Sequence, residues 1–108
     1  MVTQYFSFGE VVATSSVAEE LEITDIMQLL RWHGTMKQGV LCEEDWERNK
    51  YALNHKERIF SAYEIRGQKY YVITEWDRSC TTILRPEDYW YEVTKKAQYV
   101  WMDNVSKM

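Results

Sequence analysis

The spacing of apolar residues changes from a helical to a strand-like period near residue 58, and this change constrains the fold more than any other feature. Upstream of it, apolar side chains recur at three- and four-residue intervals between Ile26 and His33, the pattern of an amphipathic helix. Downstream of it, apolar and polar residues alternate, as they do in half-buried strands. A chain of 108 residues has room for one hydrophobic core, so helices and strands must share it.

The N-terminal half predicts one strand followed by helices. Residues 9–14 have the composition of a short strand, and Ser16 begins a capping-box pattern that indicates a short helix. Thr24 or Asp25 can cap a second helix, which Gly34 is expected to end. After an irregular loop, a third helix is expected over residues 43–55, with three acidic residues in its first turn, where they favour the helix dipole.

The C-terminal half predicts a meander of antiparallel strands over residues 58–65, 69–76 and 80–84. Gly67-Gln68 has the composition of a two-residue hairpin loop, and Arg78-Ser79 is expected to form the second loop. The resulting register pairs Asp77 with Arg58 and Cys80, and pairs Glu75 with Phe60 and Thr82.

Alternation along these strands assigns the apolar residues to two faces of the sheet. One face carries Ile59, Tyr63, Ile65, Val72, Trp76 and Ile83. The other carries Phe60, Ala62, Tyr71, Ile73 and Leu84. We therefore expect an α+β fold in one domain spanning residues 1–108, in which an antiparallel sheet of three or four strands packs against two or three N-terminal helices.

The last part of the chain, residues 90–108, is an aromatic-rich extension whose secondary structure stays open. Apolar residues from Trp90 to Val100 recur at helical spacing, whereas the run from Gln98 to Met102 is equally typical of a strand. Before it, Pro86 is expected to begin a helical turn, because proline suits an early helical position.

Charge and composition narrow the class of function. A net charge of -4 argues against general binding of nucleic acid, which depends on Lys and Arg. No apolar run approaches the ~20 residues that a membrane span requires, and the N-terminus lacks the basic and apolar regions of a signal peptide. Cys42 and Cys80 form no metal or disulfide motif, as expected of reduced thiols in a cytoplasmic protein.

Short motifs are spread over residues 8–89. They are FGEVVAT from Phe8, then His33, Gly39, Asp45, Asn49, Ala52, Arg58-Ile59, the SAY of Ser61, the ITE of Ile73, the DRS of Asp77, Thr81-Thr82 and Leu84–Tyr89. Together they resemble a family of small bacterial proteins usually labelled plasmid-related or hypothetical. The family pattern runs His-x-x-Gly-Asp-Trp-Gly between the second and third helices, whereas residues 33–39 here read HGTMKQG and lack the Asp-Trp pair. The resemblance implies a plasmid or bacteriophage setting and no established activity.

A structural network of polar side chains is expected around one end of the sheet, made of His33, Asn49, Arg58, Glu75, Asp77 and Thr82. We interpret Asp77 as a turn cap and His33 as a core residue bonded to a backbone carbonyl or to Asn49. The alternative is a small enzyme in which His33 is the general base and Glu75 or Asp77 the acid or orienting group. The pattern favours a chain that is not an enzyme, with no catalytic residue, cofactor or metal site.

Binding to a protein partner is the leading hypothesis. The candidate contacts are of two kinds: carboxylates that suit a basic channel on a target complex, and the aromatic and Met side chains of the tail, which are types that dominate interface hot spots. They are Glu43, Glu44, Asp45, Glu47, Glu87, Asp88, Trp90, Tyr91, Tyr99, Trp101 and Met102. In a plasmid or phage, such a protein is expected to inhibit a nucleic-acid-binding host defence complex, of the anti-CRISPR or anti-restriction type, without binding nucleic acid itself. Self-association through the tail, as a homodimer or a structural oligomer, is the remaining alternative.

Overall fold

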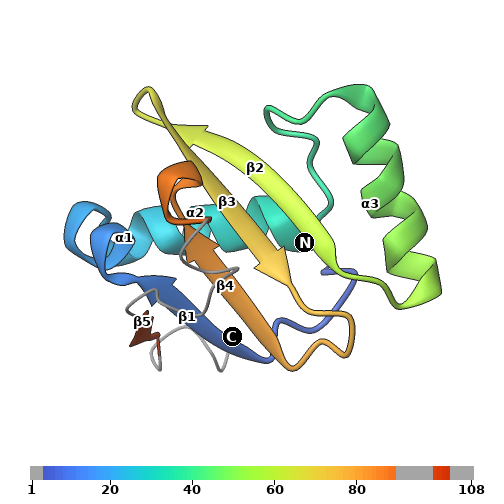
Figure 1. Ribbon diagram of the computed structural model, residues 1–108, viewed down its shortest axis with the longest axis horizontal. Helices are drawn as coiled ribbons and strands as arrows, with labels where there is room; N and C mark the ends of the chain where they lie inside the picture. The colour runs from blue at the N-terminus through green and yellow to red at the C-terminus, as the bar shows by residue number, and fades with distance from the viewer. Residues whose placement is uncertain (1–3, 90–98, 103–108) are drawn as a thin grey trace.

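The structure is a computed structural model that describes residues 4–89 and 99–102 (Figure 1). Its elements in chain order are β1 (Glu10–Thr14), α1 (Ser15–Glu20), α2 (Ile23–Gly34), α3 (Glu43–His55), β2 (Ile59–Ile65), β3 (Gln68–Thr74), β4 (Cys80–Leu84), the 3-10 turn η1 (Pro86–Asp88) and β5 (Tyr99–Trp101). The strand alternative for the tail therefore holds at β5. The helix considered from Trp90 onward lies outside the described residues, as do residues 103–108.

The strands form one sheet in the order β2-β3-β4-β1-β5. The predicted meander is confirmed, because β2, β3 and β4 pair antiparallel to their neighbours. The sheet is larger than predicted, since β1 joins it parallel to β4 and β5 pairs antiparallel to β1. The α+β fold class is thus confirmed, with five strands in a mostly antiparallel sheet.

Both hairpin registers differ from the predicted ones. The first loop is Arg66-Gly67, flanked by the pair Ile65 and Gln68, and both of its residues have positive φ, 49° and 81°. Positive φ at both loop residues is typical of the tight hairpin turn that matches the strand twist. In the second hairpin the last paired residues are Thr74 and Thr81, so a longer loop joins β3 to β4.

The assignment of side chains to faces survives this register error except at Trp76, which lies beyond the end of β3. Phe60 and Thr82 pair with Ile73, two residues before the predicted partner, Glu75. A shift of two residues keeps every side chain on its face, whereas a shift of one would exchange the faces. The predicted pairing of Asp77 with Arg58 and Cys80 is wrong, because Asp77 lies in the loop after β3.

One face of the sheet carries the main hydrophobic core. α2 buries its predicted apolar stripe there and ends at Gly34, as predicted. Its first residue is Ile23 rather than a residue after Thr24, and the Asp25 carboxylate accepts a hydrogen bond from the Glu22 amide at 3.1 Å. The core consists of Phe6, Phe8, Val11, Ala13, Val17, Leu21, Ile26, Leu29, Leu30, Ala52, Ile59, Tyr63, Tyr70, Val72 and Ile83.

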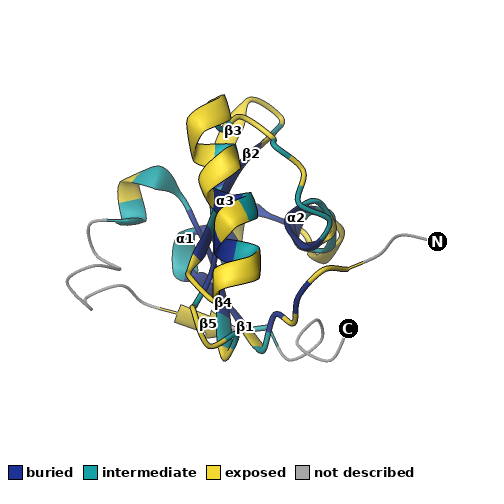
Figure 2. Cartoon of the chain, turned by 90° about the vertical axis from the view of Figure 1, so that its right-hand side faces the viewer, coloured by how far each residue is buried: buried dark blue, intermediate teal, exposed yellow. Residues whose placement is uncertain are grey.

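The third helix, α3, lies along the edge of β2 with its exposed side turned outward (Figure 2). The Asn49 side chain completes that edge, because its Oδ1 accepts from the Phe60 amide at 3.0 Å and its Nδ2 donates to the Phe60 carbonyl at 2.7 Å. The Val40 amide donates to the Ala62 carbonyl at 3.0 Å. A helix and a loop thus supply the hydrogen bonds that a further strand would supply, which protects an otherwise open edge.

We expect Asn49→Ala to lower the free energy of unfolding by about 2 kcal/mol, because the Phe60 amide and carbonyl both lose their partner beneath α3. Asn54→Ala is the matched control, since Asn54 is exposed on the same helix. Urea denaturation of both variants measures the difference. Equal stability of the two would show that the Asn49 contacts contribute nothing net.

The opposite face of the sheet is also buried at Val12, Ala62, Ile73 and Leu84. None of the helices within residues 4–89 and 99–102 combines the length and the apolarity needed to cross a membrane.

Candidate functional site

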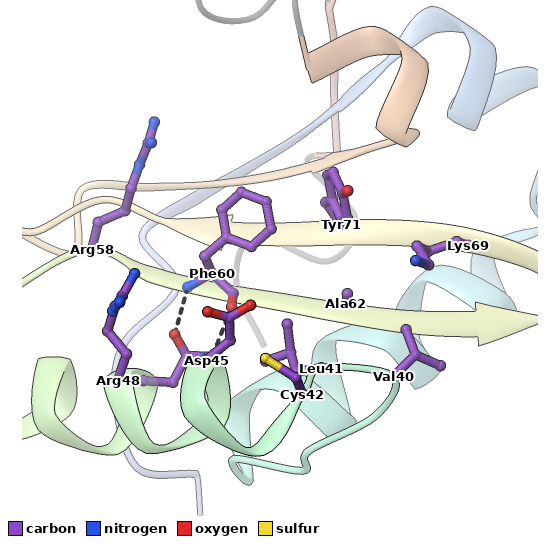
Figure 3. Close-up of a pocket in the computed structure, with 11 residues that line it drawn as sticks. Val40, Leu41, Cys42, Asp45, Arg48, Arg58, Phe60, Ala62, Lys69 and Tyr71 are labelled. Carbon is purple, nitrogen blue, oxygen red and sulfur yellow. Dashed lines mark hydrogen bonds between the residues drawn. The ribbon is translucent and has the colours of Figure 1, made fainter.

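A cleft of about 420 Å³ opens between α3 and the sheet, at the edge where α3 meets β2 (Figure 3). Its lining comes from four places: the loop before α3, the first turns of α3, the residue directly before β2, and the strands β2 and β3. The lining residues are Val40, Leu41, Cys42, Asp45, Arg48, Asn49, Arg58, Phe60, Ala62, Lys69 and Tyr71. This volume lies within the range of clefts that hold small molecules, about 300–1,000 Å³.

Two aromatic rings form the apolar wall of the cleft. Phe60 of β2 and Tyr71 of β3 lie on the same face of the sheet, with ring centroids 4.7 Å apart and planes tilted by 58°. Tyr89, directly after η1, contacts both rings edge-on, at 5.5 Å and 6.1 Å. These contacts fix the rings, while both strand residues stay half-buried and open to the cleft. The wall is therefore a continuous, packed aromatic surface.

Three cationic side chains, Arg48, Arg58 and Lys69, and one carboxylate, Asp45, line the cleft around this wall. Arg58 is 3.5 Å from a Glu75 oxygen, and Arg48 is 3.9 Å from a Glu44 oxygen with 70% of its side chain exposed. By contrast, Arg66 donates to the Asp25 carboxylate through both of its terminal nitrogens, at 3.0 Å and 2.7 Å. Exposed pairs as long as those in the cleft contribute little binding energy. The cleft cations therefore remain available to a ligand.

A second polar cluster is buried in the core and centres on His33, which is fully buried. Its Nδ1 lies 2.8 Å from the Ser61 hydroxyl and its Nε2 lies 2.8 Å from the Thr74 hydroxyl. Thr74 is 2.7 Å from the Thr81 hydroxyl, which donates to the Phe8 carbonyl at 2.8 Å. This chain of hydrogen bonds links α2 to three strands through the core.

Burial and, to a smaller extent, the nearby positive charge of Arg78 together lower the pKa of His33 from its usual 6.5 to about 3. The imidazole is therefore neutral near neutral pH, with one nitrogen donating and the other accepting. Both nitrogens are already engaged, and neither reaches solvent. A general base must come within hydrogen-bond reach of its substrate, so this position suits a structural residue.

The six residues of the predicted network fall into four separate groups. His33 and Asn49 flank Ser61, with the Asn49 Nδ2 at 3.5 Å from its hydroxyl. Arg58 and Glu75 form the long ion pair beside the cleft. Asp77 lies in the exposed β3–β4 loop and accepts from the Ser79 amide at 3.1 Å and its hydroxyl at 2.6 Å, which holds its pKa below the usual value. Thr82 is 4.0 Å from the Cys80 sulfur.

Arg78 is a central residue that the sequence reasoning missed. Its guanidinium donates to the carbonyls of Glu57 at 2.6 Å, Glu75 at 3.1 Å and Ala52 at 3.2 Å. It thus joins the end of α3 to the β3–β4 loop, and it lies over the Phe6 ring at 5.7 Å. The sequence signal was the DRS motif, which carried the family resemblance but was interpreted as a turn.

The predicted partner contacts are dispersed over the surface. The four carboxylates of α3 are exposed, and Glu87 is exposed in η1. Asp88 instead accepts from the hydroxyls of Thr14 at 3.0 Å and Ser16 at 2.6 Å, which attaches η1 to the start of α1. Tyr99 is exposed on β5, and Met102 packs against the core. Trp90 and Tyr91 lie outside the described residues, and Trp101 is described only as a backbone position of β5.

The part of the chain that the structure describes contains no group of three or more His, Cys, Asp or Glu side chains arranged to hold a metal ion. Comparison with protein-family models, with curated proteins and with solved structures finds no match.

Proposed function

We propose that the protein acts by binding a protein partner, and that the outward carboxylates of α3 are its main contact surface. The observation that supports this proposal is the distribution of charge on α3. Glu43, Glu44 and Glu47 are exposed on the outer side within its first two turns, while Asn49 and Ala52 hold the opposite side against the sheet. Asp45 is also exposed, but it lies on the side of the helix that lines the cleft.

These carboxylates are free to contact a partner. Glu44 pairs with Arg48 at 3.9 Å and Glu47 with Lys50 at 2.8 Å, both within the helix and exposed. Such pairs contribute at most about 1 kcal/mol and yield readily to a stronger cation. A rigid helix that presents several carboxylates suits a basic surface, for which charge complementarity speeds association and selects the partner.

We further propose that the partner is a nucleic-acid-binding complex of a bacterial defence system, which the protein inhibits. Two things support this step: the resemblance to plasmid-related proteins and the basic channels that such complexes must present to a phosphate backbone. The protein would then act in stoichiometric amounts, and it requires no catalytic residue.

Charge reversal on α3 tests the proposal. The partner is first captured from the natural bacterial host with the full-length protein. A Glu43→Lys, Glu44→Lys, Glu47→Lys variant is expected to bind it at least about tenfold more weakly, with a smaller salt dependence, because rim charges govern electrostatic attraction.

A matched variant carries Glu10→Lys, Glu19→Lys and Glu64→Lys, which makes the same change in net charge at exposed positions away from the first turns of α3. It is expected to keep most of the affinity. Equal weakening by both variants would show a general effect of net charge and would refute the assignment to α3. Light scattering of the same samples tests the alternative of self-association.

A further inference from the structure

The cleft beside α3 has a chemistry of its own, different from the acidic outer side of that helix. Two arginines line this cleft, Arg48 and Arg58, and both are only loosely paired with carboxylates. Arg66, Arg78 and Arg85 each make hydrogen bonds of 3.2 Å or shorter to protein oxygens. Within residues 4–89 and 99–102, Arg48 and Arg58 make ion pairs of 3.5 Å or longer and no such hydrogen bond.

Figure 3 shows how these groups are placed. Arg48 and Arg58 lie at one end of the cleft, Lys69 lies at the other, and the Phe60 and Tyr71 rings lie between them. Both positive charges at this end of the cleft attract an anion. Guanidinium groups bind phosphate through two parallel hydrogen bonds, which makes Arg pairs well suited to that anion.

The aromatic wall gives the second half of the recognition. Phe60 and Tyr71 are fixed by each other and by Tyr89, so they can receive a flat ring without being ordered first. Stacking of a base on such a side chain is sequence-tolerant, because every base has a π-face. The Asp45 carboxylate, which lies between the arginine end and the thiol of Cys42, can accept a hydrogen bond from an amino or hydroxyl group.

We propose that this cleft binds a nucleotide, with its phosphate between Arg48 and Arg58 and its base against Phe60 and Tyr71. The site is small and lies on an acidic protein, so it accommodates one nucleotide rather than a long nucleic-acid track. The nucleotide is either a free nucleoside monophosphate or one unit of a single strand. Both present the same ring and phosphate, and the two sources are separated by experiment. The inference stands independently of the partner proposed for α3.

Isothermal titration of the full-length protein with AMP, with inorganic phosphate and with an eight-nucleotide single-stranded DNA tests the proposal. AMP is expected to bind at least about tenfold more tightly than inorganic phosphate, because base stacking is worth about 1–3 kcal/mol. Tighter binding of the oligonucleotide than of AMP would identify a strand as the source, and equal or weaker binding would identify the free nucleotide.

The arginine variants test the phosphate end. Arg48→Gln and Arg58→Gln are each expected to weaken AMP binding about tenfold, the loss typical of one charged hydrogen bond. Arg31→Gln is the matched control, since Arg31 is exposed on α2 and does not line the cleft. Thermal melting of the three variants verifies that each is folded.

The exposed thiol of Cys42, which lines the cleft, gives an independent test of where the nucleotide binds. Saturating AMP is expected to slow alkylation of Cys42 and to leave that of Cys80, in the β3–β4 hairpin, unchanged. The proposal is overturned if neither AMP nor the oligonucleotide binds at millimolar concentration. It is equally overturned if inorganic phosphate binds as well as AMP, or if Arg58→Gln and Arg31→Gln behave alike.

Discussion

Lowering the pH from about 6 to about 4 is expected to destabilise the protein by roughly 1.4 kcal/mol per pH unit through His33 alone. The pKa of this buried imidazole is about 3 in the folded protein, against a usual 6.5. Between these values the unfolded chain takes up a proton and the native protein does not. The free energy of unfolding therefore falls as the pH falls through this window, and it is unaffected by His33 above it.

Urea denaturation at several pH values measures this slope, and a His33→Gln variant is expected to lose the His33 share of it. The variant is also expected to be less stable at neutral pH by about 2–4 kcal/mol, because the hydroxyls of Ser61 and Thr74 lose their partner. His55→Gln, which changes the exposed histidine at the end of α3, is the control.

Nuclear magnetic resonance of the native protein provides a second measurement that does not depend on the variant folding. The His33 ring signals are expected to show a neutral imidazole throughout the range from about pH 7 to about pH 4.5. A titration of His33 within that range, or an unchanged slope in His33→Gln, would contradict the structural role assigned to it.

A Gly9→Ala substitution is expected to destabilise the protein by at least about 3 kcal/mol, the second large effect. Gly9 has a φ of 64°, and a Cβ there would lie 2.3 Å from the backbone carbonyl of Ser79. The Glu10 amide donates to that same carbonyl at 3.0 Å. The added Cβ would thus clash with the Ser79 backbone, which is already hydrogen-bonded to the first residue of β1. The clash can be removed only if β1 and the β3–β4 loop move apart.

Gly67→Ala is the matched control for Gly9→Ala. Gly67 also has positive φ, 81°, but a Cβ there would have no atom within 4 Å. It is therefore expected to cost only about 1 kcal/mol, the strain of a left-handed residue. Thermal and urea denaturation of both variants isolate the contact with Ser79. Similar losses in the two would mean that conformation, and not close approach, explains the cost at Gly9.

Local patterns in the sequence predicted the elements and faces of this fold because they depend on neighbouring residues. The alternation in β2 and β3 placed Phe60 and Tyr71 on one face and Tyr63 and Val72 on the other. The parallel pairing of β1 with β4 was not predictable in the same way, since these strands are far apart in sequence and no turn specifies their register. Trp76 was assigned to a face but is 63% exposed in the β3–β4 loop, because β3 ends two residues earlier.

The sites were predicted less well, because they depend on the packing of distant elements. The position of His33 on the apolar stripe indicated a core residue, and the structure is consistent with that interpretation. Its partners are Ser61 and Thr74 rather than Asn49 or a carbonyl, and small hydroxyl residues in strands carry no local signal of such a role. The cleft was not predictable from the sequence. It forms because α3 packs beside the sheet and brings Arg48 close to Arg58 and to the aromatic rings of β2 and β3.

The central position of β1 in the sheet has a consequence for the order of folding. β1 is synthesised well before the two strands that flank it, β4 and β5, because three helices and two other strands lie between them in the sequence. Contacts of such long sequence separation raise the contact order and slow folding. The nascent chain must therefore hold an unpaired apolar strand until β4 emerges, and during that interval it is most exposed to aggregation and to chaperones.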